Sequence, residues 1–233
     1  MNDAHEERLQ RFGRAGLYLV TSRLLSRGRT TPEIVRAALA AGVRLIQLRE
    51  KELCARDLVA LGREIRRMTA DAGALLIVND RVDAALEIGA DGVHLGQEDL
   101  PVAAARRLAP DLIIGASTHS AEEAHAAVEA GASYVNIGPL FPTRSKEWGG
   151  TFLGIDGLRR IAGSLSIPFT VMGGIRKEHI PDLVAAGART VAVVTAVTAA
   201  DDPQRAAAEL LASIASEADR AGAGIAGPQG GAP

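Results

Sequence analysis

Three polar or basic side chains at alternate positions, Gln47, Arg49 and Lys51, could bind an anion. Alternate residues of an extended strand share one face, so this face turns from polar to basic where the strand ends. The residues on the opposite face, Ile46 and Leu48, are apolar and can pack against helices. The pattern predicts an anion site at the carboxyl end of a strand. The alternative is that Arg49 and Lys51 are solvated loop residues.

Two carboxylates, Asp80 and Asp99, follow two further apolar segments, and Asn79 ends the first of these. If the segments are neighbouring strands, the carboxylate oxygens could hold a hard divalent cation that keeps some of its water. The alternative is that each aspartate is the N-cap of the helix that follows it. This alternative is strongest for Asp99, because Pro101 follows it and proline is common at the start of a helix. His94 lies among apolar residues, which favours a structural histidine over a catalytic one.

Hydroxyl groups and another lysine lie in two later turns. Ser117 belongs to a small, hydroxyl-rich turn after a fifth apolar segment. The long stretch 138–150 holds Thr143, Ser145 and Lys146 between glycines, so it could close over a phosphorylated ligand and exclude water.

Backbone N–H groups could form a second anion site. Gly173 and Gly174 form a pair before an expected helix, and Val194 and Thr195 follow the last apolar segment. Unpaired N–H groups at the start of a helix favour a phosphate group. The sequence therefore predicts two anion sites, one made of side chains and one of backbone amides.

The elements that must position these groups alternate along the chain. Apolar, β-branched runs recur, each followed by an Ala-, Glu- and Arg-rich segment of helical period. Strands are predicted at 17–20, 43–48, 75–79, 92–95, 112–116, 134–137, 169–172 and 190–194. Helices are predicted to begin near Thr31, Arg56, Arg81, Val102, Ala121, Ile155, Lys177 and Pro203.

Eight such units predict an α/β fold, a single (β/α)8 TIM barrel, whose functional residues lie at the carboxyl ends of the strands. Its usual phosphate site follows strands 7 and 8, where the second anion site is expected. Glycines that can end a helix in the left-handed conformation precede four strands: Gly42, Gly89, Gly131 and Gly187. An open doubly wound sheet is the alternative, but no Gly-x-Gly-x-x-Gly follows the first strand.

Composition excludes several classes of function. With 26 Lys+Arg against 28 Asp+Glu the formal charge is −2, so no global field attracts nucleic acid or an anionic membrane. Four Phe, two Tyr and one Trp are too few for base-stacking platforms. The chain has one cysteine, Cys54, and no long apolar run, and its N-terminus is acidic without an apolar signal region. These features predict a cytoplasmic protein. The sequence does not determine the oligomeric state, and it allows a homo-oligomer.

Three regions are expected. Residues 1–14 are a charged N-terminal extension without clear apolar period, although Leu9 and Phe12 could dock a short helix on the barrel. Residues 15–215 form the catalytic barrel. Residues 216–233 end in a Gly-, Ala- and Pro-rich tail that buries too little surface to offset its ordering entropy, so disorder is expected there.

Taken together, these motifs resemble the thiamine-phosphate synthase family over about residues 16–214. The resemblance is carried by segments in the order in which they follow successive strands, 47–51, 79–81, 92–99, 117–119, 138–146 and 173–175. It implies a transferase that joins 4-amino-2-methyl-5-hydroxymethylpyrimidine diphosphate to a thiazole phosphate. The products are thiamine monophosphate and pyrophosphate, and the cofactor is Mg²⁺.

The resemblance also implies roles for residues. Asp80 and Asp99 would hold the metal, and Gly174, Val194 and Thr195 the thiazole phosphate. Arg49, Lys51, Ser117 and Lys146 are the expected catalytic set. The pyrimidine diphosphate would lie against Gln47, Arg49, Lys51, Asn79, Ser117, Thr143, Ser145 and Lys146. The family more often has Thr where Ser145 stands and Ser where Thr195 stands, and each departure keeps a hydroxyl.

The implied reaction needs no general base, because the thiazole nitrogen is already nucleophilic. Carbon–oxygen cleavage can precede attack, giving a carbocation-like intermediate, while cationic groups stabilise the leaving pyrophosphate. Lys146→Ala is therefore expected to depress kcat strongly without unfolding the barrel.

Two rivals remain. A thiazole tautomerase on the same fold would need a proton carrier, for which His119 or His94 is available, but it has no use for a diphosphate pocket. A non-catalytic barrel that binds a phosphorylated ligand would keep Gly173 and Gly174 and have no use for a pair of metal-binding aspartates.

Overall fold

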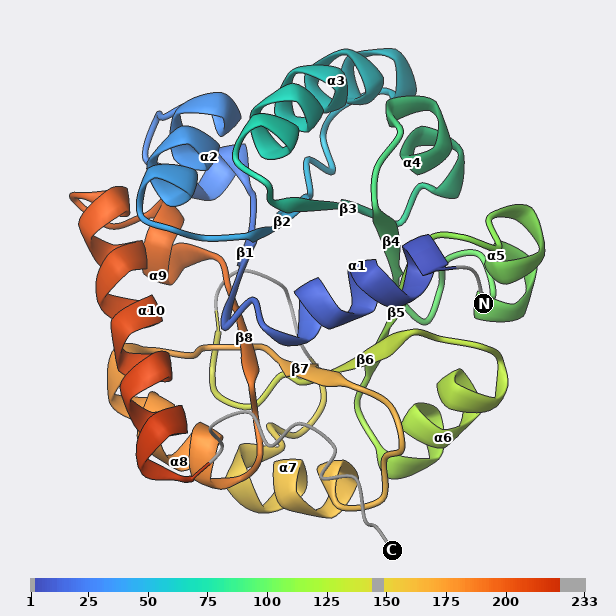
Figure 1. Cartoon of the computed structure of the whole chain (residues 1–233). Coiled ribbons are helices and arrows are strands. Elements are labelled where there is room, and N and C mark those ends of the chain that lie inside the picture. The colour runs from blue at the N-terminus through green and yellow to red at the C-terminus, as the bar shows by residue number, and fades with distance from the viewer. Residues whose placement is uncertain (1–2, 144–148, 223–233) are drawn as a thin grey trace, which may run out of the picture.

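Eight parallel strands close into a barrel in the computed structural model of the chain, which describes residues 3–143 and 149–222 (Figure 1). Each strand pairs with its sequence neighbours, and β1 pairs with β8. The predicted TIM barrel is confirmed. The strands are β1 (Leu17–Val20), β2 (Leu45–Leu48), β3 (Leu75–Asn79), β4 (Gly92–Leu95), β5 (Ile113–Thr118), β6 (Tyr134–Ile137), β7 (Phe169–Val171) and β8 (Thr190–Val193).

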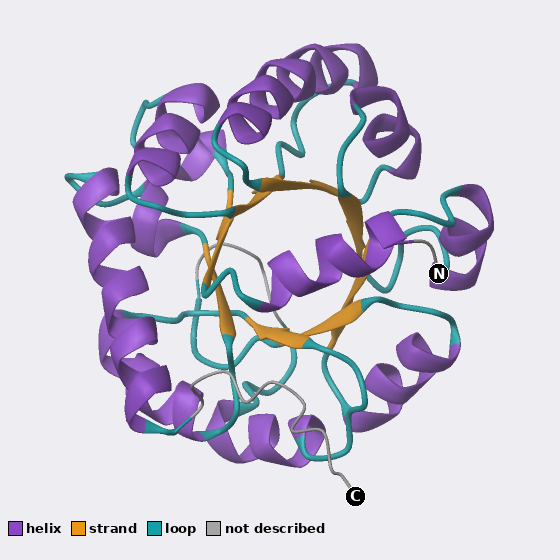
Figure 2. Cartoon of the chain, viewed as in Figure 1, coloured by secondary structure: helices purple, strands orange, loops and turns teal. Residues whose placement is uncertain are grey.

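Helices form a ring around the barrel (Figure 2). The ring contains α2 (Thr31–Ala40), α3 (Ala55–Asp71), α4 (Val82–Ile88), α5 (Val102–Leu108), α6 (Ala121–Glu129), α7 (Gly154–Ala162), α8 (Ile180–Ala185) and α10 (Pro203–Arg220). Short turns η1 (Arg23–Leu25), η2 (Lys177–His179) and α9 (Thr195–Thr198) lie in the loops. The helix expected near Lys177 thus begins as a 3₁₀ turn and continues as α8.

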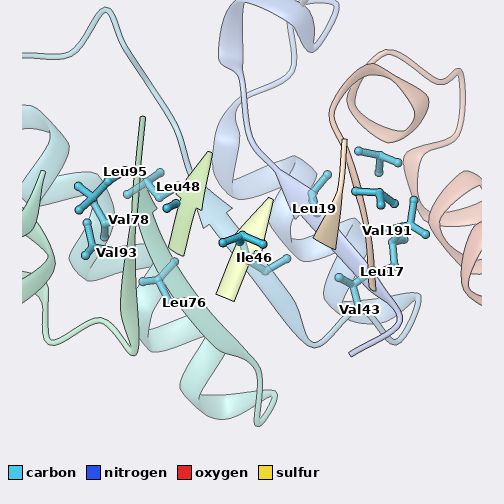
Figure 3. Close-up of a cluster of buried hydrophobic side chains, with 14 of the residues drawn as sticks. Leu17, Leu19, Val43, Ile46, Leu48, Leu76, Val78, Val93, Leu95 and Val191 are labelled. Atoms are coloured by element: carbon cyan, nitrogen blue, oxygen red, sulfur yellow. The ribbon is translucent and has the colours of Figure 1, made fainter. Parts of the chain in front are cut away.

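Strand residues alternate between the barrel interior and the helices. In β2, Ile46 and Leu48 belong to the large apolar cluster between strands and helices (Figure 3). Leu45 belongs to a second cluster inside the barrel. Burial of each such side chain contributes about 1.5–3 kcal/mol. The predicted faces of β2 are therefore confirmed from Leu45 onward.

Four strands, β2, β5, β7 and β8, differ from prediction by one or two residues at a boundary, and the differences in β2 and β5 affect the site. Val43 lies before β2 and packs in the outer cluster, because it follows the turn at Gly42, whose φ is +97°. The fifth strand runs on through Ser117 and Thr118, which pair with Asn136 and Ile137 of β6. Ser117 is thus held in the sheet rather than in a turn.

Residues 3–13 of the N-terminal extension form helix α1 (Asp3–Gly13) across the amino end of the barrel (Figure 1), and Leu9 and Phe12 dock it there as the sequence allowed. Phe12 is fully buried, with its ring centroid 4.3 Å from that of Tyr134 and 6.2 Å from that of Tyr18. One aromatic anchor inside the barrel thus orders a helix whose own sequence has little apolar period.

At the other end, α10 continues to Arg220, past the expected barrel boundary at 215. The remainder of the expected tail, residues 223–233, lies outside the described residues. Over the part of the chain that the structure describes, no helix is both long and apolar enough to cross a bilayer.

Candidate active site

A cavity of about 580 Å³ opens at the carboxyl ends of the strands. Its wall is formed by the ends of seven strands or the segments that follow them. The basic, acidic and neutral polar side chains of the wall come from four of these, β2, β3, β4 and β5. Of the residues predicted from sequence, it brings together Gln47, Arg49, Lys51, Asn79, Asp80, Asp99, Ser117 and Val194.

The basic end of β2 lies on the cavity as predicted, so Arg49 and Lys51 are not merely solvated loop residues. The Arg49 backbone N–H donates to Thr21 Oγ1 over 3.0 Å, which ties this segment to the end of β1. Lys51 Nζ lies 3.4 Å from Asp80 Oδ2. One wall therefore carries two cations and, beside them, a carboxylate.

Asp80 has two unfavourable features. Its backbone φ is +62°, a left-handed conformation that asparagine and aspartate tolerate best among residues with a side chain. Burial raises the pKa of its carboxyl, the neighbouring Asp99 carboxylate raises this pKa further, and Lys51 lowers it. Ionisation of Asp80 in the folded protein therefore carries a net electrostatic cost.

Neither aspartate caps a helix. The residue at the N-cap of α4 is Arg81, and the one at the N-cap of α5 is Pro101. Asp99 Oδ2 instead accepts the Gly96 N–H over 2.6 Å, which holds the carboxylate toward the loop after β4. The capping alternative is therefore wrong for both residues.

This pair fits a magnesium ion. Two carboxylates that repel each other in a partly buried wall are stabilised by a cation, and Mg²⁺ takes few protein oxygens while keeping water and phosphate ligands. Among the described residues, no group of three or more His, Cys, Asp or Glu forms a fuller metal site. Asp80 and Asp99 therefore suit a metal that also binds substrate.

The cavity floor is neutral and hydrogen-bonded. Gln47 is 1 % exposed and donates from Nε2 to the Tyr18 hydroxyl over 2.7 Å. His94 Nδ1 lies 2.9 Å from the Tyr134 hydroxyl, and His94 Nε2 lies 2.9 Å from Ser117 Oγ. Both ring nitrogens of His94 thus have partners, as expected of a structural histidine.

The loops after β6, β7 and β8 meet at the same end of the barrel, but Thr143, Gly174 and Thr195 are not on the lining of this cavity. Gly174 has φ +63°, and a side chain there would overlap the Phe141 and Pro142 carbonyls. This glycine is therefore needed for the close approach of two loops. Ser145 and Lys146 lie outside the described residues.

Some lining residues have no role in the reaction predicted from sequence, and one of them, His119, is named there only as the proton carrier of the rival tautomerase. His119 Nδ1 lies 2.8 Å from Glu123 Oε2, which also accepts the His119 N–H over 2.7 Å. The spacing of four residues at the start of α6 could have signalled this pair. Val20 and Met172 also line the cavity, and their types carry no such signal.

A second hollow, of about 700 Å³, lies outside the barrel wall around α2, α3 and the turn before α2. Arg23, Arg29 and Glu50 are among its lining residues. Among the residues that the structure describes, none of the site residues predicted from sequence lines this hollow.

Comparison with known proteins shows the family to which the chain is similar. The family model described as thiamine monophosphate synthase matches residues 17–197. The thiamine-phosphate synthase of Chloroflexus aurantiacus is 45 % identical over 205 residues, 88 % of this chain and 95 % of that protein. The thiamine-phosphate synthase of Moorella thermoacetica is 49 % identical over 195 residues, which cover 83 % of this chain and 93 % of that protein. A solved structure, thiamine phosphate pyrophosphorylase from Pyrococcus furiosus, is 39 % identical with a TM-score of 0.82, covering 89 % of this chain and 98 % of that one.

Proposed function

The chain belongs to the thiamine monophosphate synthase family and is a transferase of thiamine biosynthesis, and on that premise we propose which groups of its site perform the reaction. The substrates are 4-amino-2-methyl-5-hydroxymethylpyrimidine diphosphate and 4-methyl-5-(2-phosphooxyethyl)thiazole. The pyrimidine's exocyclic carbon loses its bond to the diphosphate oxygen and gains a bond to the thiazole nitrogen. Thiamine monophosphate and pyrophosphate leave.

The observation that supports this proposal is the composition of one cavity wall. Arg49, Lys51, Asp80 and Asp99 all line a space of about 580 Å³. A diphosphate needs cations and a metal at the same place, whereas a ligand with a single phosphate could be held by backbone amides alone.

Asp80 and Asp99 would hold Mg²⁺. When bound, the ion would neutralise charge on the diphosphate oxygens as pyrophosphate leaves. The left-handed turn at Asp80 and the Gly96 N–H on Asp99 orient the two carboxylates toward the cavity before any ligand arrives.

The basic residues carry the electrostatic part of the mechanism. Arg49 and Lys51 stabilise the charge that grows on pyrophosphate as the carbon–oxygen bond breaks ahead of attack, and Lys146 would join them. Loss of one preorganised contact of this kind costs about 10² to 10³ in rate. The thiazole nitrogen carries no proton to remove, so no residue need act as a general base.

The remaining groups orient the two heterocycles. Gln47 and Ser117 would contact the pyrimidine ring from the floor of the cavity, and Asn79 its diphosphate. Thr143 and Ser145 would lie near the pyrophosphate. The loops at Gly174 and at Val194 and Thr195 would bind the thiazole phosphate, at the position where barrels of this type bind phosphate.

The test is release of pyrophosphate from the two substrates with Mg²⁺. Wild-type protein is expected to release pyrophosphate and form thiamine monophosphate, and Arg49→Ala to be about 10² to 10³ slower. Arg63→Ala is the matched control, since that arginine pairs with Glu87 on the outer helices. No pyrophosphate above a protein-free control, or equal rates for Arg49→Ala and Arg63→Ala, would contradict the proposal.

A further inference from the structure

Five side chains form a continuous hydrogen-bonded chain across the barrel interior beneath the cavity. It runs from Gln47 on β2 through Tyr18 on β1, Tyr134 on β6 and His94 on β4 to Ser117 on β5. The hydroxyls of Tyr18 and Tyr134 are 3.0 Å apart. Both tyrosines are fully buried, so water does not compete for these hydrogen bonds.

The direction of the first hydrogen bond sets the direction of the others. Gln47 Nε2 can only donate, so the Tyr18 hydroxyl accepts and its single hydrogen goes to the Tyr134 oxygen. The Tyr134 hydrogen then goes to His94 Nδ1 over 2.9 Å. A neutral imidazole with an accepting Nδ1 carries its hydrogen on Nε2.

The two ends of the chain are thereby fixed. His94 Nε2–H donates to Ser117 Oγ over 2.9 Å, which leaves the Ser117 hydrogen for the cavity. At the other end, the bond to Tyr18 turns Gln47 Nε2 toward the barrel interior and leaves Oε1 as an acceptor for a ligand. Both end residues line the cavity.

The two tyrosine hydroxyls are suited to maintain this sequence of donors and acceptors. Burial raises the pKa of the Tyr18 and Tyr134 hydroxyls above the ordinary value, so each keeps its single hydrogen. The Tyr134 ring has a fixed place, because Phe12 packs against it and any side chain at Gly115 would overlap it.

We propose that Tyr18, Tyr134 and His94 are positioning residues that determine which hydrogen-bonding atoms Gln47 and Ser117 present to the substrate. Gln47 presents an acceptor and Ser117 a donor. An aminopyrimidine ring complements them, since its amino group donates and its ring nitrogens accept. The inference rests on the proposed function for the identity of this ring and on the structure for the chain itself.

The first test needs no substrate. In protein labelled with ¹⁵N-histidine, His94 Nδ1 is expected to resonate as an unprotonated, pyridine-type nitrogen and Nε2 as a protonated, pyrrole-type one. The signals are assigned by their loss in His94→Asn. Tyr134→Phe, which removes only a hydroxyl, is expected to give a mixture of tautomers. A protonated Nδ1 in the wild type, or an unchanged tautomer in Tyr134→Phe, would overturn the proposal.

The second test is kinetic. Tyr134→Phe and Tyr18→Phe are each expected to raise KM for the pyrimidine diphosphate about tenfold, the loss expected for one directed hydrogen bond, with a smaller fall in kcat. KM for the thiazole phosphate should not change. Thr69→Val is the matched control, because it removes a buried hydroxyl that donates to Arg66 O, away from the cavity.

The outcomes separate this inference from the proposed function. A wild-type protein that releases no pyrophosphate contradicts the function, while the histidine spectrum still tests the chain. Normal wild-type turnover with unchanged KM in both tyrosine variants contradicts the chain alone. If Tyr134→Phe is poorly folded by its melting curve, the KM of Tyr18→Phe decides, because the Tyr18 hydroxyl belongs to the same hydrogen-bonded chain on the Gln47 side.

Discussion

Two aspartates at opposite ends of the barrel have opposite surroundings. Asp91 comes just before β4 at the amino end and is 4 % exposed. Its carboxylate accepts from Arg66 Nη1 at 2.7 Å and from the Leu76 N–H at 2.9 Å, and Arg8 Nε of α1 lies 3.5 Å away. The buried carboxylate is thus paired with two arginines and a backbone N–H within the fold.

Asp80 comes just after β3 at the carboxyl end, where its nearest acidic neighbour is Asp99. It adopts a left-handed backbone conformation, and its pKa is raised by burial and by that neighbour. The amino end therefore pairs its buried carboxylate with cations and a backbone donor, while the carboxyl end places two carboxylates together and offsets their repulsion only in part through Lys51.

The direction of the pKa shift of Asp80 determines how the free energy of unfolding changes with pH. Below the ordinary carboxyl pKa, Asp80 is protonated in both the folded and unfolded protein, and the shift has no effect. As pH rises through the raised pKa, the unfolded chain has already lost the proton that the folded protein retains, and stability falls. Above the raised pKa the metal-free protein bears the full cost.

The largest effect is expected at the carboxyl end. Asp99→Asn keeps an oxygen for the Gly96 N–H but removes a charge from the metal pair. Pyrophosphate release should fall about 10³-fold, or roughly 4 kcal/mol, with part of the loss recovered at high Mg²⁺. Asp156→Asn, an exposed aspartate on α7, is the control. Equal rates for the two variants would remove Asp99 from the site.

At the amino end, Phe12→Ala should lower the free energy of unfolding by about 3 kcal/mol, because it leaves a cavity beneath Tyr18 and Tyr134. Chemical denaturation measures this loss. Leu86→Ala, at a side chain that is 50 % exposed, should cost less than about 0.5 kcal/mol. A Phe12 variant as stable as the Leu86 variant would mean that α1 does not help to hold the barrel together.

Asp91→Asn should cost about 2 kcal/mol of stability, since Arg66 and Arg8 lose a charged partner while the amide can still accept a hydrogen bond. The arginine side chains are about 30 % exposed, so water offsets part of the loss. Turnover per folded molecule should stay at the wild-type value. A drop in turnover without a drop in stability would contradict the division between the two ends.

The smallest effect is a gain. Asp80→Asn keeps a residue that tolerates a left-handed backbone and removes the repulsion by Asp99, so the metal-free protein should melt about 2 °C higher at pH 7. The gain should vanish below about pH 4, where wild-type Asp80 is protonated in both states. Melting curves at both pH values measure it, and a gain that persists at the lower pH would rule out charge as its cause.

Much of this molecule is predictable from its sequence because the information is local. Period-two and helical patterns predict the strands, and polar residues at strand ends indicate the cavity that holds Arg49, Asp80 and Asp99. For helix α1 the sequence indicates only that Leu9 and Phe12 could dock it, because the rings that contact Phe12 lie on β1 and β6, which are distant in sequence.

The hydrogen-bonded chain escapes sequence-based prediction for the same reason. Tyr18 and Tyr134 are 116 residues apart, and each alone looks like an ordinary aromatic strand residue. Only closure of the barrel brings them between Gln47 and His94. Sequence patterns reveal which face a residue occupies but not which residue faces it across the interior.

The contrast between the two ends is tested most directly by melting Asp80→Asn and Asp91→Asn beside the wild type, with and without Mg²⁺, and measuring pyrophosphate release from the same samples. We predict that Asp80→Asn melts higher without metal, gains no stability from Mg²⁺ and loses turnover, whereas Asp91→Asn melts lower, keeps the gain from Mg²⁺ and keeps turnover. Two variants that shift melting and turnover in the same direction would contradict the opposite roles of the two ends.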